Sequence, residues 1–327
     1  MSSIVIRITR TFACVMFVLL NMGCEAPLNL EGIEREEALI THRFDQFQAS
    51  ARNQRAVIVV GSSGVILSSA DNGENWHRNE LLGKPTLVDV SACTNGKFIA
   101  LSAERQLWLS EDDGANWQSH SIETEESLTT LTCAPDNTLW LGGSFSTLMS
   151  SQDPAKGWQT FSLGEDAMIT AIQFIDKQNA FALGEFGLVL HSNDNGQNWQ
   201  LREPLPNELY PQAALFQSLE VGFVVGLNGK ILSTQDSGRS WVFEKTDTDK
   251  PLFGLGMLDG ELYAVGENGV LLHRGKKQWM TTPHHNHARS YLRSIQPLDE
   301  HQLLLAGGGG AMFRFSPEHS STLLVTK

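Results

Sequence analysis

A tryptophan that returns at a fixed interval is the feature that most constrains the fold of this chain. Five segments end in Ser/Thr-x-Asp-x-Gly-x-x-Trp or a near copy, and their tryptophans are Trp76, Trp117, Trp158, Trp199 and Trp241. The intervals are 41, 41, 41 and 42 residues, and a weaker copy ends at Trp279 after 38 more. A constant period of this size is typical of repeat architectures, in which each unit is one supersecondary motif.

Each repeat also contains a short apolar run that ends in a turn. The seven aligned runs are 57–61, 98–101, 139–143, 180–184, 222–226, 262–266 and 303–307. They are too short for helices and rich in β-branched residues, which favours strands. A second strand follows the turn, another begins at the tryptophan, and a further apolar run lies upstream, so each unit holds four strands. The sequence therefore predicts an all-β, seven-bladed β-propeller of four-stranded antiparallel blades over residues 44–327.

The seventh unit leaves the closure of the ring open. It keeps the apolar run 311–315 but has no aspartate motif. Its last strand is either 322–325 or a strand supplied by the N-terminal segment.

The N-terminus has the pattern of a secretion signal. Arg7 and Arg10 precede an apolar run over 12–22, which is about half the ~20 residues that a spanning helix requires. The ending Leu-Asn-Met-Gly-Cys resembles a bacterial lipobox, which implies lipidation of Cys24. We expect a lipoprotein signal peptide over 1–23 and a polar tether over 24–43, with plain secretion or an uncleaved anchor as alternatives. The protein would then face the periplasm, anchored by lipid to the inner or the outer membrane.

Two cysteines, Cys93 and Cys133, remain in the body of the exported protein. They precede corresponding strands of adjacent repeats, and an oxidising compartment permits a disulfide. Their offsets in the repeat differ by one residue, however, which predicts side chains on opposite faces of their strands. The favoured interpretation is two buried thiols.

The aspartate motif has a structural explanation. Its Ser or Thr and its Asp can bond to turn amides, its Gly supplies positive φ, and its Trp pins the turn onto the sheet. The copies would be spread around a rim, whereas paired carboxylates that act together need a separation of about 5–10 Å. We therefore predict no catalytic or metal site in these motifs. Their residues are Ser69, Asp71, Gly73, Trp76, Ser110, Asp112, Gly114, Trp117, Asp153, Trp158, Ser192, Asp194, Gly196, Trp199, Thr234, Asp236, Gly238 and Trp241.

These motifs resemble the Asp-boxes, or BNR repeats, of several propeller families. A strand ending in Val-Gly, followed by x-x-Gly, Ile-Leu and the Asp-box, looks like the photosystem II stability/assembly factor family. The resemblance covers about residues 44–316, and 222–241 is the most similar copy. It implies a seven-bladed, non-enzymatic chaperone without a cofactor. Photosynthetic members carry a basic patch for their partner, whereas this chain has a net charge of −13.

Charge and composition argue against several other classes. A net charge of −13 argues against binding to nucleic acid or to anionic lipid. Sialidases also carry Asp-boxes but need an arginine cluster and a tyrosine nucleophile, and the sequence singles out only Arg293, on an expected channel strand. The cluster His284-His285-Asn286-His287 has no acidic or cysteine partner nearby, so no metal is predicted. The run 307–310 is better interpreted as a hairpin turn than as a phosphate loop.

The connections between blades are the expected partner-binding region. In this strand order they share one face with the glycine turns, while the Asp-boxes lie on the other. The acidic residues on that face are Glu123, Glu125, Glu126, Glu165, Asp166, Glu203, Glu208, Asp247 and Asp249. We predict a monomeric assembly factor or accessory subunit that binds an envelope or membrane protein there. Two alternatives stay open: the acids only keep the protein soluble, or a carbohydrate-binding or glycosidase-like propeller uses the central channel.

Overall fold

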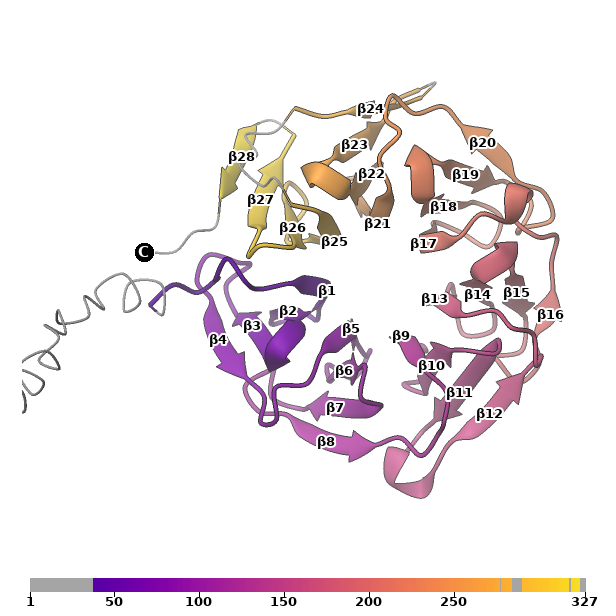
Figure 1. Ribbon diagram of the computed structural model, residues 1–327, viewed down its shortest axis with the longest axis horizontal. Helices are drawn as coiled ribbons and strands as arrows, with labels where there is room; N and C mark the ends of the chain where they lie inside the picture. The colour runs from indigo at the N-terminus through magenta and orange to yellow at the C-terminus, as the bar shows by residue number, and fades with distance from the viewer. Residues whose placement is uncertain (1–37, 277, 284–289, 318, 324–327) are drawn as a thin grey trace, which may run out of the picture. The chain divides into compact units, whose positions relative to one another are not determined.

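The repeat unit folds, in each of seven copies, into a four-stranded antiparallel sheet (Figure 1). The computed structural model describes residues 38–276, 278–283, 290–317 and 319–323. The strand order within every blade follows the chain, from the innermost strand to the outermost. The predicted all-β, seven-bladed propeller is therefore confirmed.

The strands of blades 1 to 3 are β1 (Phe47–Arg52), β2 (Val57–Gly61), β3 (Val65–Ser69), β4 (His77–Glu80), β5 (Leu87–Ala92), β6 (Phe98–Ser102), β7 (Gln106–Ser110), β8 (Gln118–Ser121), β9 (Leu128–Cys133), β10 (Leu139–Gly143), β11 (Thr147–Ser151) and β12 (Gln159–Ser162). Those of blades 4 and 5 are β13 (Ile169–Phe174), β14 (Ala180–Gly184), β15 (Val189–Ser192), β16 (Gln200–Leu201), β17 (Pro211–Phe216), β18 (Gly222–Gly226), β19 (Ile231–Thr234) and β20 (Val242–Glu244). Those of blades 6 and 7 are β21 (Leu252–Leu258), β22 (Glu261–Gly266), β23 (Leu271–Arg274), β24 (Trp279–Thr281), β25 (Leu292–Pro297), β26 (Leu303–Gly307), β27 (Met312–Ser316) and β28 (His319–Leu323). Short 3-10 turns occur at η1 (Ser62–Gly64), η2 (Pro154–Lys156), η3 (Glu185–Gly187), η4 (Pro206–Glu208), η5 (Leu227–Gly229) and η6 (Glu267–Gly269).

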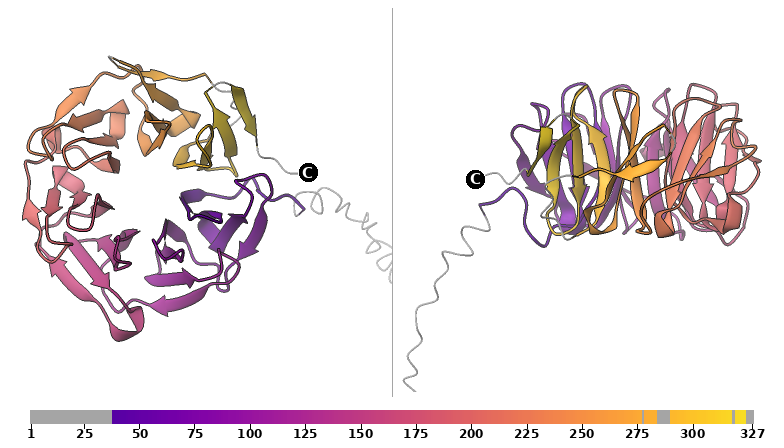
Figure 2. Two further views of the ribbon diagram at one scale, coloured as in Figure 1. Left: turned by 180° about the vertical axis from the view of Figure 1, so that it is seen from behind. Right: turned by 90° about the horizontal axis from the view of Figure 1, so that it is seen from above.

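The seven blades stand in a ring with their innermost strands around its centre (Figures 1 and 2), and residues of these strands line a central channel. Viewed edge-on, the ring is a flat disc (Figure 2). The hydrophobic core lies between neighbouring blades: Ile58 and Val60 of β2, for example, share one cluster with Phe98 of β6. Because both sides of the second strands are covered in this way, β2, β6, β10, β14, β18 and β26 are buried at every residue. This explains why the sequence shows them as continuous apolar runs rather than alternating ones.

The ring closes without sharing a strand between the two ends of the chain. The last strand of blade 7 is its own β28, which pairs with β27, so the first of the two alternatives for this blade is the one observed. The closing contacts come instead from residues just before β1. Gly310 donates its N–H to the carbonyl of Asp45 over 2.9 Å, and Gln46 forms an isolated bridge with Gly308.

A buried ion pair holds this closing segment in place. The guanidinium of Arg78, on β4, donates to both carboxylate oxygens of Asp45 at 2.8 and 2.9 Å. The side chain of Asp45 is only 1% exposed. The seam between blades 1 and 7 is therefore made by hydrogen bonds and packing.

Some sequence predictions fall outside the described residues. These are the signal peptide over 1–23, the lipidation site Cys24, the tether up to residue 37, and the His284 to His287 cluster. Within the part of the chain that is described, no helix has the length and apolar character to cross a membrane.

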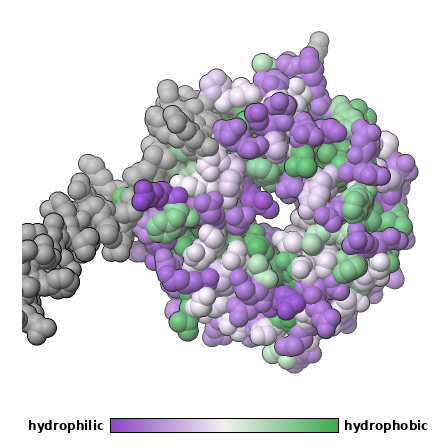
Figure 3. All heavy atoms as spheres, in the orientation of Figure 1, coloured by the Kyte–Doolittle hydropathy of each residue, from purple (hydrophilic) through white to green (hydrophobic). Residues whose placement is uncertain are grey.

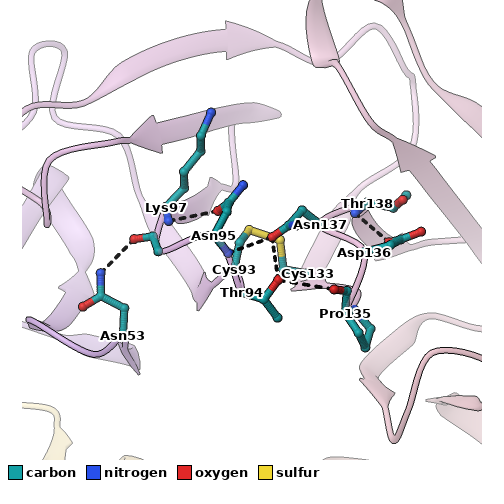
Figure 4. The surroundings of a disulfide bond; sticks show 11 residues. Asn53, Cys93, Thr94, Asn95, Lys97, Cys133, Pro135, Asp136, Asn137 and Thr138 are labelled. Atoms are coloured by element: carbon teal, nitrogen blue, oxygen red, sulfur yellow. Dashed lines mark hydrogen bonds between the residues drawn. A yellow bond between two sulfur atoms is a disulfide. The ribbon is translucent and has the colours of Figure 1, made fainter.

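The interpretation of Cys93 and Cys133 as two free thiols is wrong. They form a disulfide between blades 2 and 3, with their Cα atoms 5.1 Å apart (Figure 4). Strand β5 ends at Ala92, so Cys93 lies one residue beyond it, in a hairpin turn where its carbonyl accepts from Gly96 N–H. The alternation of side chains applies only within a paired strand. The two cysteines differ by one residue in their position within the repeat, but this difference does not place their side chains on opposite faces.

Candidate functional site

The disc has two faces of different construction. The first, here the turn face, carries the turns between the second and third strands and the connections between blades. In blade 1 these two kinds of loop contact each other directly, because Gly64 N–H donates to the carbonyl of Pro85 at 2.6 Å. The second, here the Asp-box face, carries the hairpins between the first and second strands and the Asp-boxes themselves. Figure 1 looks onto the turn face, on which several 3-10 turns appear as short coiled ribbons.

Each regular Asp-box uses its polar groups within its own turn. In blade 1 the hydroxyl of Ser69 donates to Asp71 Oδ1 at 2.8 Å and accepts the N–H of Gly73 at 2.8 Å. The other bonds to Asp71 come from the backbone and side chain of Asn75, at 2.9 and 2.8 Å. These bonds from Asn75 lower the pKa of Asp71 to about 2. Trp76 Nε1 then donates to the carbonyl of Gly73, which closes the turn.

The bonds of the hydroxyl and the carboxylate recur in three further blades, whereas the indole bond recurs in blade 2 and not in blades 4 and 5. Ser110, Ser192 and Thr234 accept the N–H of the motif glycine in blades 2, 4 and 5, at 2.9, 2.8 and 3.0 Å. Bonds from Asn116 lower the pKa of Asp112, and bonds from Ser240 and neighbouring groups lower that of Asp236. Carboxylates held ionised by their own turns are poor proton donors. Nothing in this arrangement brings two of them together.

Blades 3 and 6 hold their tryptophans differently. In blade 3, where Ala155 replaces the motif glycine, Ser151 donates to the carbonyl of Gly157 and Asp153 caps the short η2 turn. In blade 6, Trp279 is fully buried and donates to Glu244 Oε2 of the neighbouring blade at 2.8 Å. Arg274 makes two bonds of 2.8 Å to the same carboxylate. A partly exposed ion pair thus takes the place of a local Asp-box.

The acidic residues predicted for the partner face lie after the outer strands or in the connections of the turn face. Most are exposed, but two have a task within the fold. Glu126 accepts the hydroxyl of Ser144, and Asp247 accepts the N–H of Thr281 at 2.9 Å, which fixes strand β24. Among the described residues, Asp249 pairs with Lys250, at 3.4 Å. Apart from Asp247, the exposed residues without an ion pair to any described residue are Glu123, Glu125, Glu165, Asp166, Glu203 and Glu208.

The turn face also carries groups that the sequence reasoning missed. Phe145, Phe186 and Leu227 are 49%, 63% and 42% exposed, and they lie in the turns of blades 3, 4 and 5. Figure 3, in the same orientation as Figure 1, shows hydrophobic groups in green over blades 4 and 5 among hydrophilic ones. The turns add three acidic residues: Glu104, Glu185 and Glu267. The signal was present in the sequence, since an aromatic residue occupies a turn position where other blades have Asn, Ser or Gly.

The central channel contains the one arginine that the sequence singled out. Arg293, on β25, lines a cavity of about 200 Å³ together with residues from all seven innermost strands. Asp89, on β5, lines the same cavity and accepts the N–H of Leu131 at 2.8 Å and the hydroxyl of Thr130 at 3.1 Å. Burial raises the pKa of Asp89 to about 6, even though these bonds and the charge of Arg293 favour its ionised form. The channel therefore combines one cation with one carboxylate that titrates near neutrality.

No metal centre is apparent in the described ranges. Within residues 38–276, 278–283, 290–317 and 319–323, no group of three or more His, Cys, Asp or Glu side chains is placed to hold a metal ion.

Comparison with known proteins relates this construction to one family and one fold. The family model "Photosynthesis system II assembly factor YCF48" matches residues 85–202, which span blades 2 to 4. No curated protein sequence matches the chain. The resemblance predicted from the repeats is confirmed by this match.

Solved structures share the architecture at low sequence identity. YCF48 from Cyanidioschyzon merolae is 15% identical, with a TM-score of 0.67 over 86% of this chain and 98% of its own. A structure of YCF48 bound to a D1 peptide is 14% identical, with a TM-score of 0.68 over 85% of this chain and 94% of its own. A catalytically inactive virginiamycin B lyase from Staphylococcus aureus, with quinupristin, is 10% identical and has a TM-score of 0.72 over 84% of this chain and 96% of its own. At these identities the structures show a shared fold, and the lyase shows that the fold also serves enzymes. Blades 2 to 4 thus match the YCF48 family model, and the described chain shares the seven-bladed propeller fold of the YCF48 structures.

Proposed function

We propose that this chain is a non-enzymatic, exported propeller lipoprotein that binds another envelope or membrane protein, as an assembly factor or accessory subunit. The observation that carries the proposal is the turn face, where six exposed carboxylates form no ion pair with any described residue and three hydrophobic residues are exposed beside them. The family match and the D1-peptide complex of YCF48 support binding of a protein partner. Loops held by a rigid scaffold are where binding residues gather.

The disulfide supports export. Bridges such as Cys93–Cys133 persist in oxidising compartments such as the periplasm and are rare in the cytosol. The N-terminal order of charged, apolar and small residues supports a signal peptide over 1–23 that is followed by Cys24 as the lipidated residue. We expect labelled palmitate to be incorporated by the wild type and lost from Cys24→Ser, which would also leave the membrane fraction. If the wild type incorporates no labelled palmitate, the lipoprotein part of the proposal is wrong.

The absence of an enzymatic role is supported by how the ionisable groups are used. The carboxylates of the regular Asp-boxes are held by their own turns, so they serve the fold. A monomer is proposed because the turn face is acidic and two copies would repel each other there.

Neutralising the acidic loops tests partner binding. The turn-face variant carries Glu165→Gln, Asp166→Asn, Glu203→Gln and Glu208→Gln. The control variant makes the same change of charge in hairpins of the Asp-box face, with Glu220→Gln, Asp259→Asn, Asp299→Asn and Glu300→Gln. We expect wild type and control to recover the same partner from an envelope extract, and the turn-face variant to recover at least several-fold less. A wild type that recovers nothing above an unrelated propeller overturns the proposal.

A second candidate function is ligand binding in the channel, including carbohydrate binding or a glycosidase-like activity. It is favoured by Arg293, an exposed cation that has no hydrogen bond or ion pair to any described residue. A ligand that binds the folded protein raises its melting temperature, so a glycan panel should shift the wild type and not Arg293→Ala. If the panel shifts neither protein, this candidate is lost.

A further inference from the structure

Phe186 occupies a backbone position that an aromatic residue rarely takes. It is the middle residue of η3, with φ 56° and ψ 24°, in the left-handed region. In blades 1, 5 and 6 the same position holds Ser63, Asn228 and Asn268, which have small or polar side chains. A bulky residue held in this region costs on the order of 1–3 kcal/mol.

No other part of the described structure compensates this cost by burying the ring. The side chain of Phe186 is 63% exposed, although the turn beneath it is tightly packed. A Cβ on the neighbouring Gly187 would lie 2.7 Å from the carbonyl oxygen of Leu205, so the backbone cannot easily move away from the connection between blades 4 and 5. The aromatic ring is therefore held out from the surface by a fixed turn.

Blade 3 repeats the arrangement. Phe145 has φ 53° and is 49% exposed at the equivalent turn position. Leu227, one residue earlier in the turn of blade 5, is 42% exposed. Three neighbouring blades thus present hydrophobic side chains on one part of the turn face. Clustered exposed hydrophobic groups of this kind mark interaction sites.

A groove begins at Phe186. Its cavity of about 930 Å³ is lined by Phe186, Pro204, Leu205 and Pro206, with Glu203 and Glu208 among the same lining residues. It continues along the outer wall between blades 4 and 5 to Arg239 and Trp241, past β16, which has only two residues. The adjoining residues Asn207 and Glu208 also have positive φ, of 58° and 50°. We call this feature the Phe186 groove.

The charge around the groove indicates what fits it. Glu203 and Glu208 are exposed, and so are Glu165 and Asp166 in the connection between blades 3 and 4. None of the four forms an ion pair with another described residue, and the one cation that lines the groove is Arg239 at its far end. A second copy of this chain, with a net charge of −13, would bring like charges together.

We infer that the Phe186 groove binds an extended, basic segment of a partner protein whose apolar side chains contact Phe186, Phe145 and the two prolines, an inference that rests on the function proposed above. Aromatic residues at the centre of an interface contribute much of its binding energy. The surrounding carboxylates would steer lysines and arginines of the segment and set its orientation.

Fluorescence anisotropy with defined peptides tests this chemistry on the full chain. The probe is a labelled (Lys-Leu-Pro)4 peptide, which is extended, basic and apolar. The comparison peptides are (Glu-Leu-Pro)4 and (Lys-Ser-Pro)4, which remove the charge match and the apolar contacts respectively. We expect the first to bind and both others to bind at least about 10-fold more weakly, a difference of about 1.4 kcal/mol.

Two substitutions place the binding at the groove. Phe186→Asn introduces the residue that blades 5 and 6 carry at this turn position, so the fold should tolerate it. It should weaken binding of (Lys-Leu-Pro)4 at least about 10-fold. The matched control is Leu82→Asn, because Leu82 is 94% exposed on the same face, in the connection between blades 1 and 2. This control should bind as the wild type does.

Each other outcome overturns the inference. If Phe186→Asn binds (Lys-Leu-Pro)4 as tightly as the wild type does, the groove is not the binding site. If the glutamate peptide binds more tightly than the lysine peptide, the argument from charge is wrong. If the wild type does not bind (Lys-Leu-Pro)4, the inferred basic and apolar segment is wrong. A wild-type dimer that Phe186→Asn dissociates would show that a second copy occupies the groove. The envelope pull-down separates the two proposals: a partner recovered equally by wild type and Phe186→Asn contradicts only the groove, whereas no partner for the wild type contradicts the proposed function.

Discussion

The two faces of the ring use their side chains in different ways. On the Asp-box face, the hydroxyl, carboxylate, glycine and tryptophan of blade 1 bond to one another, and blades 2, 4 and 5 repeat the bonds of the hydroxyl and the carboxylate. On the turn face, one turn position changes from Ser63 to Phe145, Phe186 and Asn228 as the chain passes from blade to blade. The repeated residues are those that the fold requires. Where departures from the repeat leave groups exposed and unpaired, we propose that they mark the functional surface.

The largest expected difference between the faces is in stability. Trp76 is 5% exposed and packs with residues of blades 1 and 7, so Trp76→Ala should lower the free energy of unfolding by about 3–5 kcal/mol. Phe186→Ala, which removes an aromatic ring of the turn face, should change it by less than about 0.5 kcal/mol. Urea unfolding of the two variants measures both values. Equal losses would mean that the turn face also supports the fold.

The channel, which joins the two faces, should show an intermediate effect that depends on pH. Burial raises the pKa of Asp89 to about 6, so the folded protein binds this proton more tightly than the unfolded chain does. The wild type should therefore lose stability as the pH rises from about 4 to about 6, by about 1–3 kcal/mol. Asp89→Asn should remove that part of the pH dependence, and the exposed control Asp259→Asn should keep it. The measurement is the melting temperature of each protein between these pH values. If the melting temperatures of the wild type and Asp89→Asn change with pH in parallel, the prediction is wrong.

The smallest effect concerns the backbone of the turn face. Asparagine tolerates the left-handed region better than phenylalanine, so Phe145→Asn and Phe186→Asn should each stabilise the fold by up to about 1 kcal/mol. The two turns lie in different blades, and their effects should add. The measurement is the urea midpoint of each single variant and of the double variant. A loss of stability in either single variant would show that its aromatic ring contributes to packing.

The overall fold was predictable because its determinants recur. The interval between tryptophans, the buried second strands and the glycine turns each appear several times, so a coincidental match in one repeat does not mislead the prediction. Features that occur once in the chain could not be checked against other repeats in this way. The Cys93–Cys133 disulfide was missed because one of the two cysteines lies in a hairpin turn, where the alternation within strands no longer places side chains. The closure by β28 was undecidable because blade 7 lacks the motif that marks the last strand elsewhere.

The candidate site was predicted in part. The acidic connections could be assigned to one face from strand order alone. The hydrophobic groups beside them were missed, because a search for repeated residues passes over Phe145 and Phe186, which differ from the residues at this position in most other blades. The groove beside Phe186 is lined by residues of a turn, of the connection between blades 4 and 5 and of an Asp-box, and side-chain patterns do not predict that these segments adjoin one cavity.

The disulfide also determines what happens if the chain is cut. Its cysteines are 40 positions apart, so the bridge encloses β6, β7, β8 and nearly all of β9 in one covalent loop. A protease that cleaves a single peptide bond inside this loop produces two fragments that remain joined through sulfur. On a non-reducing gel such a protein migrates with nearly the mass of the intact chain, and only a reductant releases the pieces. The segment between Cys93 and Cys133 can therefore be cleaved once while both fragments stay covalently joined.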